Sequence, residues 1–411
     1  MITVSDISRQ DIEDVKQKFL ALTGLRSAEC QIEQVGLEQF LRFAVGQEAP
    51  LYRHVLGTIN NELPPDHQLK SRLTLLVDRG GKVLESPEVE MLRALITRSL
   101  RVTSEQLVES YRVKFAPFRG GEEAIITQPA NHVIQGRRGV GKSSLILMGV
   151  ERIRAENNMP VWIDMQVYRG RDEPKVAMEV VNEVFRLLTD EETPALPELD
   201  RIRDQIEQFL ASKDGGEAEL RTFLPRCRDV VRIWTRTTKK RLFVFLDDAH
   251  LLAPGIQPFV FDTIYSILKA AGGWIKVAGV KTLLRLYEPQ SHKGLEIPHD
   301  AQIIDLDLNL VNPAAAKEYL ESILNQFIKP CGFTHANAFL PSQARERLVW
   351  CSAGVPRDFL WLLERAIGNA QNYRRLKVGV QDVNLAIGEF SQTKLQELDL
   401  DTNQEESARV K

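Results

Sequence analysis

The chain has 411 residues, and its 53 basic and 56 acidic side chains leave a net charge of −3, so no overall positive field recruits nucleic acid. Any such binding must come from a local basic patch. The four cysteines are widely scattered, which excludes a zinc site or redox motif of close pairs and predicts reduced thiols in a cytoplasmic protein. Apolar runs are too short to span a bilayer, and acidic residues occur early without a signal-peptide core, so we expect neither a membrane segment nor a secretion signal.

Residues 1–114 are expected to form a mostly helical accessory domain that binds a protein partner. Apolar residues recur at helical spacing over 12–20 and again over 37–44. Ser86 followed by Pro87 is typical of a helix start. Residues 73–77 and 83–84, with two glycines between them, predict a small hairpin. No catalytic constellation is found in this region.

Residues 136–143 read G-R-R-G-V-G-K-S, which satisfies the phosphate-loop pattern. Its glycines allow positive φ and a close approach of the backbone to a polyphosphate. The N–H groups of the loop and the positive end of the next helix would then bind the β-phosphate. Lys142 would contact the β- and γ-phosphates, and the Ser143 hydroxyl would bind Mg²⁺. The residues expected to bind the nucleotide are Gly136, Arg137, Arg138, Gly139, Val140, Gly141, Lys142, Ser143 and Ser144.

The surroundings of this loop favour a phosphate site over a chance glycine-rich turn. A short apolar run at 132–134 suits a buried strand before the loop, and apolar residues over 145–150 suit a helix after it. Strand, loop and helix therefore occur in the order that the pattern requires.

A second part of the site is expected about a hundred residues later. Residues 242–246 read L-F-V-F-L, as in a strand buried on both faces of a parallel sheet, and are followed by Asp247 and Asp248. Ligands bind at the carboxyl ends of such strands. We assign Asp247 to the Mg²⁺ shell and Asp248 to orienting the attacking water. The alternative for Asp248 is a cap on the following turn, and His250 is either a site residue or a structural histidine.

The rest of the segment 115–310 alternates strands with helices. Strands are predicted at 161–167, 274–280 and 301–306, and helices at 174–188 and around 201–211. This alternation predicts a parallel sheet with right-handed crossovers.

A basic stretch over 221–241 is the one strong local charge signal. Arg228, Arg232 and Arg236 are four residues apart and would share one helical face. The buried side of this helix would be formed by Val230, Val231, Ile233 and Trp234. The arginines would bind the phosphate backbone of DNA or an acidic neighbour, or they form an ordinary solvated face.

Residues 311–400 are expected to be helical, and the polar tail 401–411 to be disordered. Helices begin at Pro313, after Pro341, at Pro356 and near residue 382, since proline is favoured in the first helical turn.

Three segments occur in an order that resembles AAA+ ATPases. They are G-R-R-G-V-G-K-S, then F-V-F-L-D-D-A-H at 243–250, then G-V-P-R at 354–357. Within that group the chain looks most like the origin-recognition branch, which overlaps the STAND signalling ATPases. The resemblance covers about 115–389, and residues 293–308 also look like that branch. It implies an α/β P-loop NTPase sheet domain followed by a helical lid, with ATP and Mg²⁺ bound between them.

The resemblance also implies roles for single residues. Arg357 matches the lid arginine that reaches the γ-phosphate, so Lys142, Asp248 and Arg357 form the expected catalytic set. A surface arginine at a helix start is the alternative for Arg357. Sensor one is either Lys281 or Thr282. Arg285 stands near the position of an arginine finger acting between copies in a homo-oligomer, but many solvated arginines occupy such places.

We therefore predict an ATP-binding AAA+ switch in a DNA transaction. Most relatives have glutamate at the position of Asp248. Because the aspartate side chain is one methylene shorter than that of glutamate, hydrolysis is expected to be slow. The alternative is a STAND-like regulatory ATPase in defence or stress signalling that acts through a protein partner. It is favoured by the paired aspartates, by the unassigned N-terminal region and by the short sequence after the lid, in which we expect no winged-helix domain.

Overall fold

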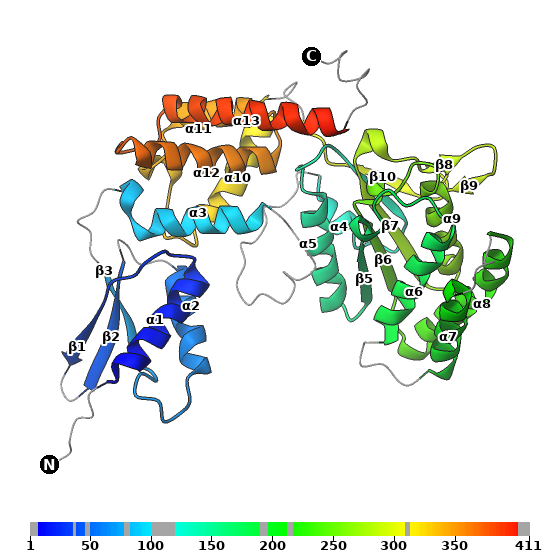
Figure 1. The fold of residues 1–411 in the computed structure, drawn as a ribbon, viewed down its shortest axis with the longest axis horizontal. Helices are drawn as coiled ribbons and strands as arrows, with labels where there is room; N and C mark the ends of the chain where they lie inside the picture. The colour runs from blue at the N-terminus through cyan, green and yellow to red at the C-terminus, as the bar shows by residue number, and fades with distance from the viewer. Residues whose placement is uncertain are drawn as a thin grey trace. The chain divides into compact units, whose positions relative to one another are not determined.

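The computed structural model describes residues 7–35, 38–45, 50–77, 83–100, 120–189, 196–211, 217–308 and 313–401. These residues divide into two compact units (Figure 1). One unit contains residues 120–308, and the other contains the described residues up to 100 together with those from 313 onward.

A five-stranded parallel sheet forms the centre of the unit 120–308. Its strand order is β10-β4-β7-β6-β5. The strands are β4 (His132–Gln135), β5 (Met159–Asp164), β6 (Leu242–Asp247), β7 (Gly273–Gly279) and β10 (Gln302–Asp305). All predicted strands of this region are confirmed, although β5 is shorter than expected because Met165–Tyr168 form a 3₁₀ turn, η3. Every residue of β6 is buried, as its continuous apolar run predicted.

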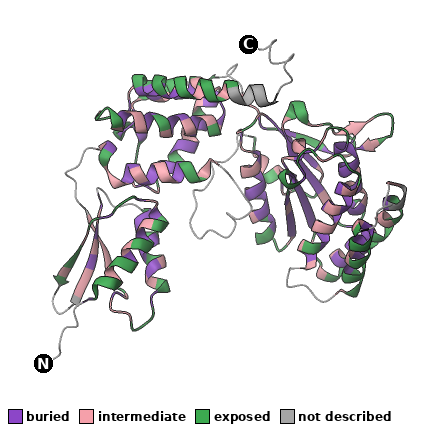
Figure 2. Cartoon of the chain, viewed as in Figure 1, coloured by how far each residue is buried: buried purple, intermediate pink, exposed green. Residues whose placement is uncertain are grey.

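Helices cover both faces of this sheet (Figure 1). Helices α4 and α5 lie on one face, and α6 and α9 pack on the other. The helices of the unit are α4 (Glu122–Ile125), α5 (Lys142–Ala155), α6 (Lys175–Thr189), α7 (Pro197–Ala211), α8 (Glu217–Thr238) and α9 (Gln257–Leu268). Figure 2 shows the sheet strands buried between these layers.

Short elements connect β6, β7 and β10. They are the 3₁₀ turns η4 (Ala249–Leu251) and η5 (Lys281–Leu283) and the two-stranded hairpin of β8 (Tyr287–Glu288) and β9 (Lys293–Gly294). Along α8, Val230, Val231 and Trp234 are buried as expected. Ile233 is 39% exposed, so its assignment to the buried side was wrong.

The N-terminal region combines helices with a three-stranded sheet, which corrects the expectation of a mostly helical domain. Its elements are α1 (Arg9–Thr23), β1 (Cys30–Val35), β2 (Glu38–Val45), α2 (Pro50–Glu62), β3 (Leu73–Val77), the 3₁₀ turn η1 (Val83–Glu85) and α3 (Pro87–Ser99). The predicted helix over 37–44 is wrong, because residues 38–45 form β2. Leu41, Phe43 and Val45 alternate on its buried face, and the Phe43 ring lies 4.2 Å from that of Phe19.

The predicted hairpin near residue 80 is also wrong. Strand β3 pairs in parallel with β2, and residues 83–85 form η1 instead of a returning strand. The helix start at Pro87 is confirmed, with Ser86 as its N-cap.

The C-terminal helices belong to the same unit as the N-terminal region. They are α10 (Pro313–Ile328), η6 (Ala336–Ala338), α11 (Ser342–Cys351), α12 (Pro356–Asn372) and α13 (Val380–Asp401). Helix α3 packs against α10 and α12. The Arg93 guanidinium donates to Glu364 Oε1 at 3.1 and 2.6 Å and to Gln371 Oε1 at 2.7 Å. The expected disorder of the tail concerns residues that lie, apart from Asp401, outside the described part of the chain.

Candidate nucleotide site

The phosphate-loop segment lies between the carboxyl end of β4 and the start of α5, as the sequence predicted. Gly136, Gly139 and Gly141 have φ values of 151°, 81° and 107°, a region that favours glycine. A Cβ added to Gly136 would lie 2.9 Å from Val140 Cγ2 and 3.2 Å from Asp307 Oδ1. The glycines therefore serve both the turn of the loop and its close packing.

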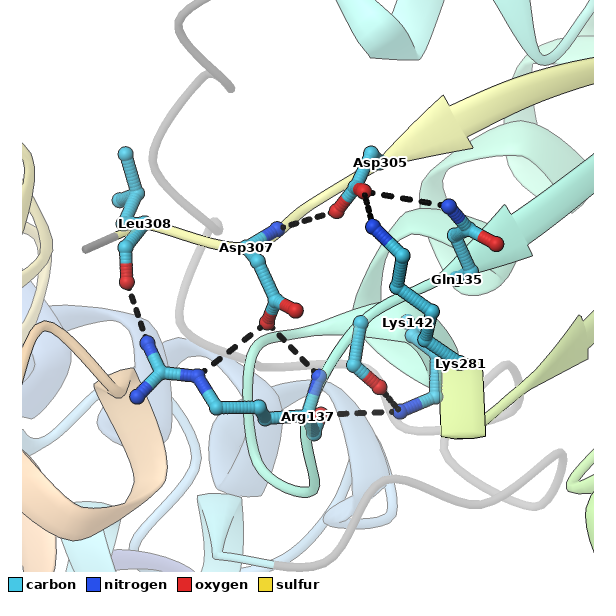
Figure 3. A network of polar contacts seen from close by, with 8 residues as sticks. Gln135, Arg137, Lys142, Lys281, Asp305, Asp307 and Leu308 are labelled. Carbon is cyan, nitrogen blue, oxygen red and sulfur yellow. Dashed lines mark hydrogen bonds and ion pairs between the residues drawn. The ribbon is translucent and has the colours of Figure 1, made fainter. Parts of the chain in front are cut away.

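Lys142 is folded back into the loop that precedes it (Figure 3). Its Nζ donates to the carbonyl oxygens of Gly136 and Arg137 at 3.1 and 3.0 Å. The residue is only 6% exposed. An incoming phosphate would compete with these carbonyls for the ammonium protons, and its negative charge would make the stronger hydrogen bond.

The side chain of Ser143 lies close to that of Asp247, and its hydroxyl favours the charged carboxylate, which lowers the pKa of Asp247. Asp247 ends β6, is 5% exposed, and accepts the backbone N–H of Asp248 at 2.9 Å. Burial, followed by the charge of Asp248, raises the pKa of Asp247 to about 7. A carboxylate buried in this way is stabilised by a cation, so Ser143 and Asp247 fit the expected Mg²⁺ shell together with phosphate oxygens. Within the described ranges, no cluster of three or more His, Cys, Asp or Glu side chains offers a different metal site.

Asp248 lies directly after this strand in the left-handed conformation, with φ 51° and ψ 34°. Strained backbone of this kind is often found at functional sites. Its side chain makes no capping hydrogen bond to η4, which removes the support for the capping alternative. The carboxylate is 40% exposed, and its Oδ1 lies 3.8 Å from Nδ1 of His250, whose side chain is 4% exposed. Asp248 therefore presents a partly solvated carboxylate next to Asp247.

Other candidate residues are placed less directly. Arg357 is exposed in the first turn of α12, in the other compact unit, and its γ-phosphate role stays a prediction. Lys281 and Thr282 are exposed in η5, directly after β7, so sensor one also stays a prediction. Arg285 forms an ion pair with Glu288, and its N–H donates to Gln257 Oε1 at 2.8 Å.

The basic helix α8 is less uniform than the sequence indicated. Arg228 is half-buried, Arg232 forms an ion pair with Asp229 at 3.0 Å, and Arg236 is exposed. A contribution of these arginines to DNA binding stays a prediction.

The sequence analysis missed two aspartates beside the loop. Asp305 ends β10, and Asp307 follows it; Figure 3 shows both in a polar network with Gln135, Arg137 and Lys281. The available signal was acidic residues at the carboxyl end of a predicted strand, within the segment 293–308.

No family model matches the sequence, and no curated protein matches it. Solved structures do resemble it. Cdc6p from Pyrobaculum aerophilum is 17% identical, with 69% of this chain and 70% of that chain covered and a TM-score of 0.43. The ORC1 protein of Aeropyrum pernix, solved with DNA, is 15% identical, with 72% of each chain covered and a TM-score of 0.45. The Drosophila ORC bound to DNA is also 15% identical, with 84% and 75% covered and a TM-score of 0.45.

In fold the chain is similar to these Cdc6 and ORC structures. The three TM-scores lie below 0.5, so any statement about activity depends on the residues of this chain. None of the helices in the described part is both long and apolar enough to cross a bilayer.

Proposed function

We propose that the chain binds ATP with Mg²⁺, hydrolyses it slowly, and acts as an AAA+ nucleotide-dependent switch in a DNA transaction. The main support is the phosphate loop, in which Lys142 donates to two loop carbonyls at 3.0–3.1 Å, with Ser143 beside the buried Asp247. A five-stranded parallel sheet carries these residues at the carboxyl ends of β4 and β6, where ligands bind in such folds.

Each residue has a defined task in this proposal. The loop N–H groups and Lys142 bind the phosphates, with Lys142 leaving its carbonyl partners to do so. Ser143 and Asp247 hold Mg²⁺, which when bound neutralises charge on the phosphates. Asp248 accepts a hydrogen bond from the attacking water and orients it. Arg357 is proposed to respond to the γ-phosphate from the helical region, because a planar guanidinium matches phosphate oxygens.

Nucleotide binding by the full chain tests this proposal. We expect Lys142→Ala to weaken MgATP binding by about 100-fold, because a buried charge-assisted contact to phosphate is lost. Calorimetric titration with MgATP and MgADP measures the effect. Lys269→Ala is the matched control, since this lysine is exposed at the end of α9, before the amino end of β7, and has no part in the proposed site. Wild-type protein that binds neither nucleotide, or Lys142→Ala protein that binds like wild type, would contradict the proposal.

The DNA part of the proposal has its own test. Steady-state ATP hydrolysis is measured with and without duplex DNA, in wild type and in a variant with Arg228, Arg232 and Arg236 changed to glutamate. Stimulation by DNA that the charge reversal abolishes supports a DNA-transaction ATPase with α8 as the contact. DNA binding that survives the change unaltered excludes α8 as that contact.

A STAND-like regulatory ATPase is the second candidate. It is favoured by the attachment of the N-terminal region to the C-terminal helices through Arg93, Glu364 and Gln371, which would carry a nucleotide signal to a protein-binding domain. ATP hydrolysis indifferent to DNA, together with tight nucleotide binding, would favour this candidate.

A further inference from the structure

Asp307, the second residue after β10, lies beside the first residues of the phosphate loop because of strand register. Strands β10 and β4 pair in parallel, with Asp305 opposite Gln135, and Leu306 N–H extends the ladder to Gln135 O at 2.9 Å. The next contact between these two segments is made by a side chain and not by the backbone. Asp307 Oδ1 accepts the backbone N–H of Arg137 at 2.7 Å (Figure 3).

Arg137 strengthens this contact with its own side chain. Its Nε lies 3.3 Å from the same Asp307 oxygen, and its Nη2 donates to Leu308 O. The guanidinium therefore neutralises the carboxylate that holds its backbone. Glycine at position 136 is needed here, since a Cβ would lie 3.2 Å from Asp307 Oδ1.

Asp307 is itself held in place by Asp305. Asp307 N–H donates to Asp305 Oδ1 at 3.0 Å. Asp305 Oδ2 accepts from Gln135 Nε2 at 3.1 Å and from Lys281 Nζ at 2.8 Å. The contact to the loop is thus anchored on the ends of β4 and β7, which are rigid elements of the sheet.

Both backbone polar groups of Arg137 are hydrogen-bonded: its N–H donates to Asp307, and its carbonyl oxygen accepts from Lys142. Under the proposed function, Lys142 leaves that carbonyl when it turns to the phosphates. The contact of the Arg137 N–H with Asp307 does not involve Lys142, so it continues to fix this limb of the loop.

We propose that Asp307 is a positioning residue of the nucleotide site, which keeps the first limb of the phosphate loop in its binding shape through the Arg137 N–H. This inference rests on the proposed ATP binding. Asp307 contacts no phosphate itself; it lowers the entropy that the loop loses when nucleotide binds. The Arg137 guanidinium has the second task of screening the Asp307 carboxylate from the polyphosphate.

Calorimetric binding of MgADP to the full chain tests the positioning role. We expect Asp307→Ala to weaken binding about tenfold, because the loop must be ordered at the moment of binding. Asp307→Asn retains an oxygen that accepts the same N–H and is expected to stay within about threefold of wild type. Asp300→Asn is the control: it removes an equal charge before the start of β10, where the carboxylate accepts from the Tyr265 hydroxyl and the Glu296 N–H but does not contact the loop or Asp307.

A second measurement separates positioning from general stability. Amide hydrogen exchange over residues 136–141 in nucleotide-free protein should be faster in Asp307→Ala than in wild type, with the thermal midpoint of the chain unchanged. Asp307→Ala binding within twofold of wild type, or Asp307→Asn as defective as Asp307→Ala, overturns the inference.

The Arg137→Ala variant tests whether the guanidinium screens the Asp307 carboxylate. It keeps the backbone N–H at position 137 but leaves the carboxylate without its neutralising charge. Its MgADP binding should be weaker than wild type at low salt and recover as salt rises, since salt screens exposed charges. A defect that salt does not change overturns the screening role.

Wild-type protein that fails to bind MgADP overturns the proposed function as well. If wild type binds and Lys142→Ala does not, a normal Asp307→Ala variant overturns the positioning role alone.

Discussion

In the proposed function, Asp248 is the residue on which the hydrolysis step depends. Its left-handed backbone, with φ 51°, directs the chain away from β6 immediately after Asp247 and leaves its carboxylate 40% exposed. Two adjacent carboxylates thus have different surroundings, with Asp247 buried and Asp248 partly solvated. Different environments of this kind allow paired acids to take different roles.

Changing Asp248 to asparagine separates these roles. We expect turnover of MgATP to fall by about 10²–10⁴-fold, because a neutral amide holds the attacking water less strongly than a carboxylate and cannot take its proton. Affinity for MgATP should stay close to wild type, since Lys142, Ser143 and Asp247 are unchanged. Single-turnover hydrolysis at saturating nucleotide measures the first quantity and calorimetry the second. Turnover equal to wild type would remove Asp248 from the mechanism.

A buried pair joins strands β4 and β7 at their neighbouring positions His132 and Lys276. Both residues are 0% exposed, and Lys276 Nζ contacts His132 Nδ1 at 2.7 Å, Gln128 O at 2.8 Å and Ala130 O at 2.7 Å. Three acceptors match the three protons of an ammonium. Burial, followed by the charge of Lys276, lowers the pKa of His132 to about 3.

This pair predicts loss of stability in acid. The unfolded histidine, with a pKa near 6.5, binds a proton below that pH that the folded residue does not bind until about pH 3. The free energy of unfolding therefore falls as pH drops from 6.5, by up to about 1.4 kcal/mol per pH unit. His132→Gln should reduce this slope, whereas the exposed His299→Gln should not. Urea unfolding between pH 7 and 4.5 measures it, and equal slopes for His132→Gln and wild type would exclude the assignment.

At the scale of elements, a continuous apolar run identified β6, because a strand covered on both faces has no polar side. Residues 37–44 were mistaken for a helix because the apolar residues at 37, 40, 41 and 44 fit a helical period. Leu41, Phe43 and Val45 fit the period of a strand, and packing against α1 favours this second pattern. Helix α9 escaped prediction because it is apolar on nearly every side.

Some residues of the candidate site could be predicted from a local sequence pattern, and others depend on which strands pair. The phosphate loop is a local pattern and was predicted residue by residue. Asp307 was missed because its contact with Arg137 spans 170 positions and depends on the pairing of β10 with β4. No local periodicity encodes which strands become neighbours, so residues brought together by sheet register are found only in the fold.

At the scale of the whole molecule, the two ends of the chain share one compact unit. Helix α3 buries an apolar face against α10 and α12, formed by Val89, Met91, Leu92, Leu95 and Ile96. Gln371 also donates to Leu84 O at 2.6 Å, so the turn before α3 is held by α12 as well. The C-terminal helices therefore pack on a helix that precedes the unit 120–308 in sequence.

Two truncations that differ by this helix test whether the C-terminal helices depend on it. A chain of residues 83–411 keeps α3, and a chain of residues 101–411 lacks it. Burial of each apolar side chain contributes about 1.5 kcal/mol or more. The loss of five such side chains therefore approaches the whole free energy of unfolding of a typical domain. We expect the shorter chain to lose the helical part, as a lower thermal midpoint or aggregation, and the longer chain to retain it. Equal midpoints would show that α10 to α13 fold without α3, and the N-terminal region would then be an appended domain instead of a part of the helical unit.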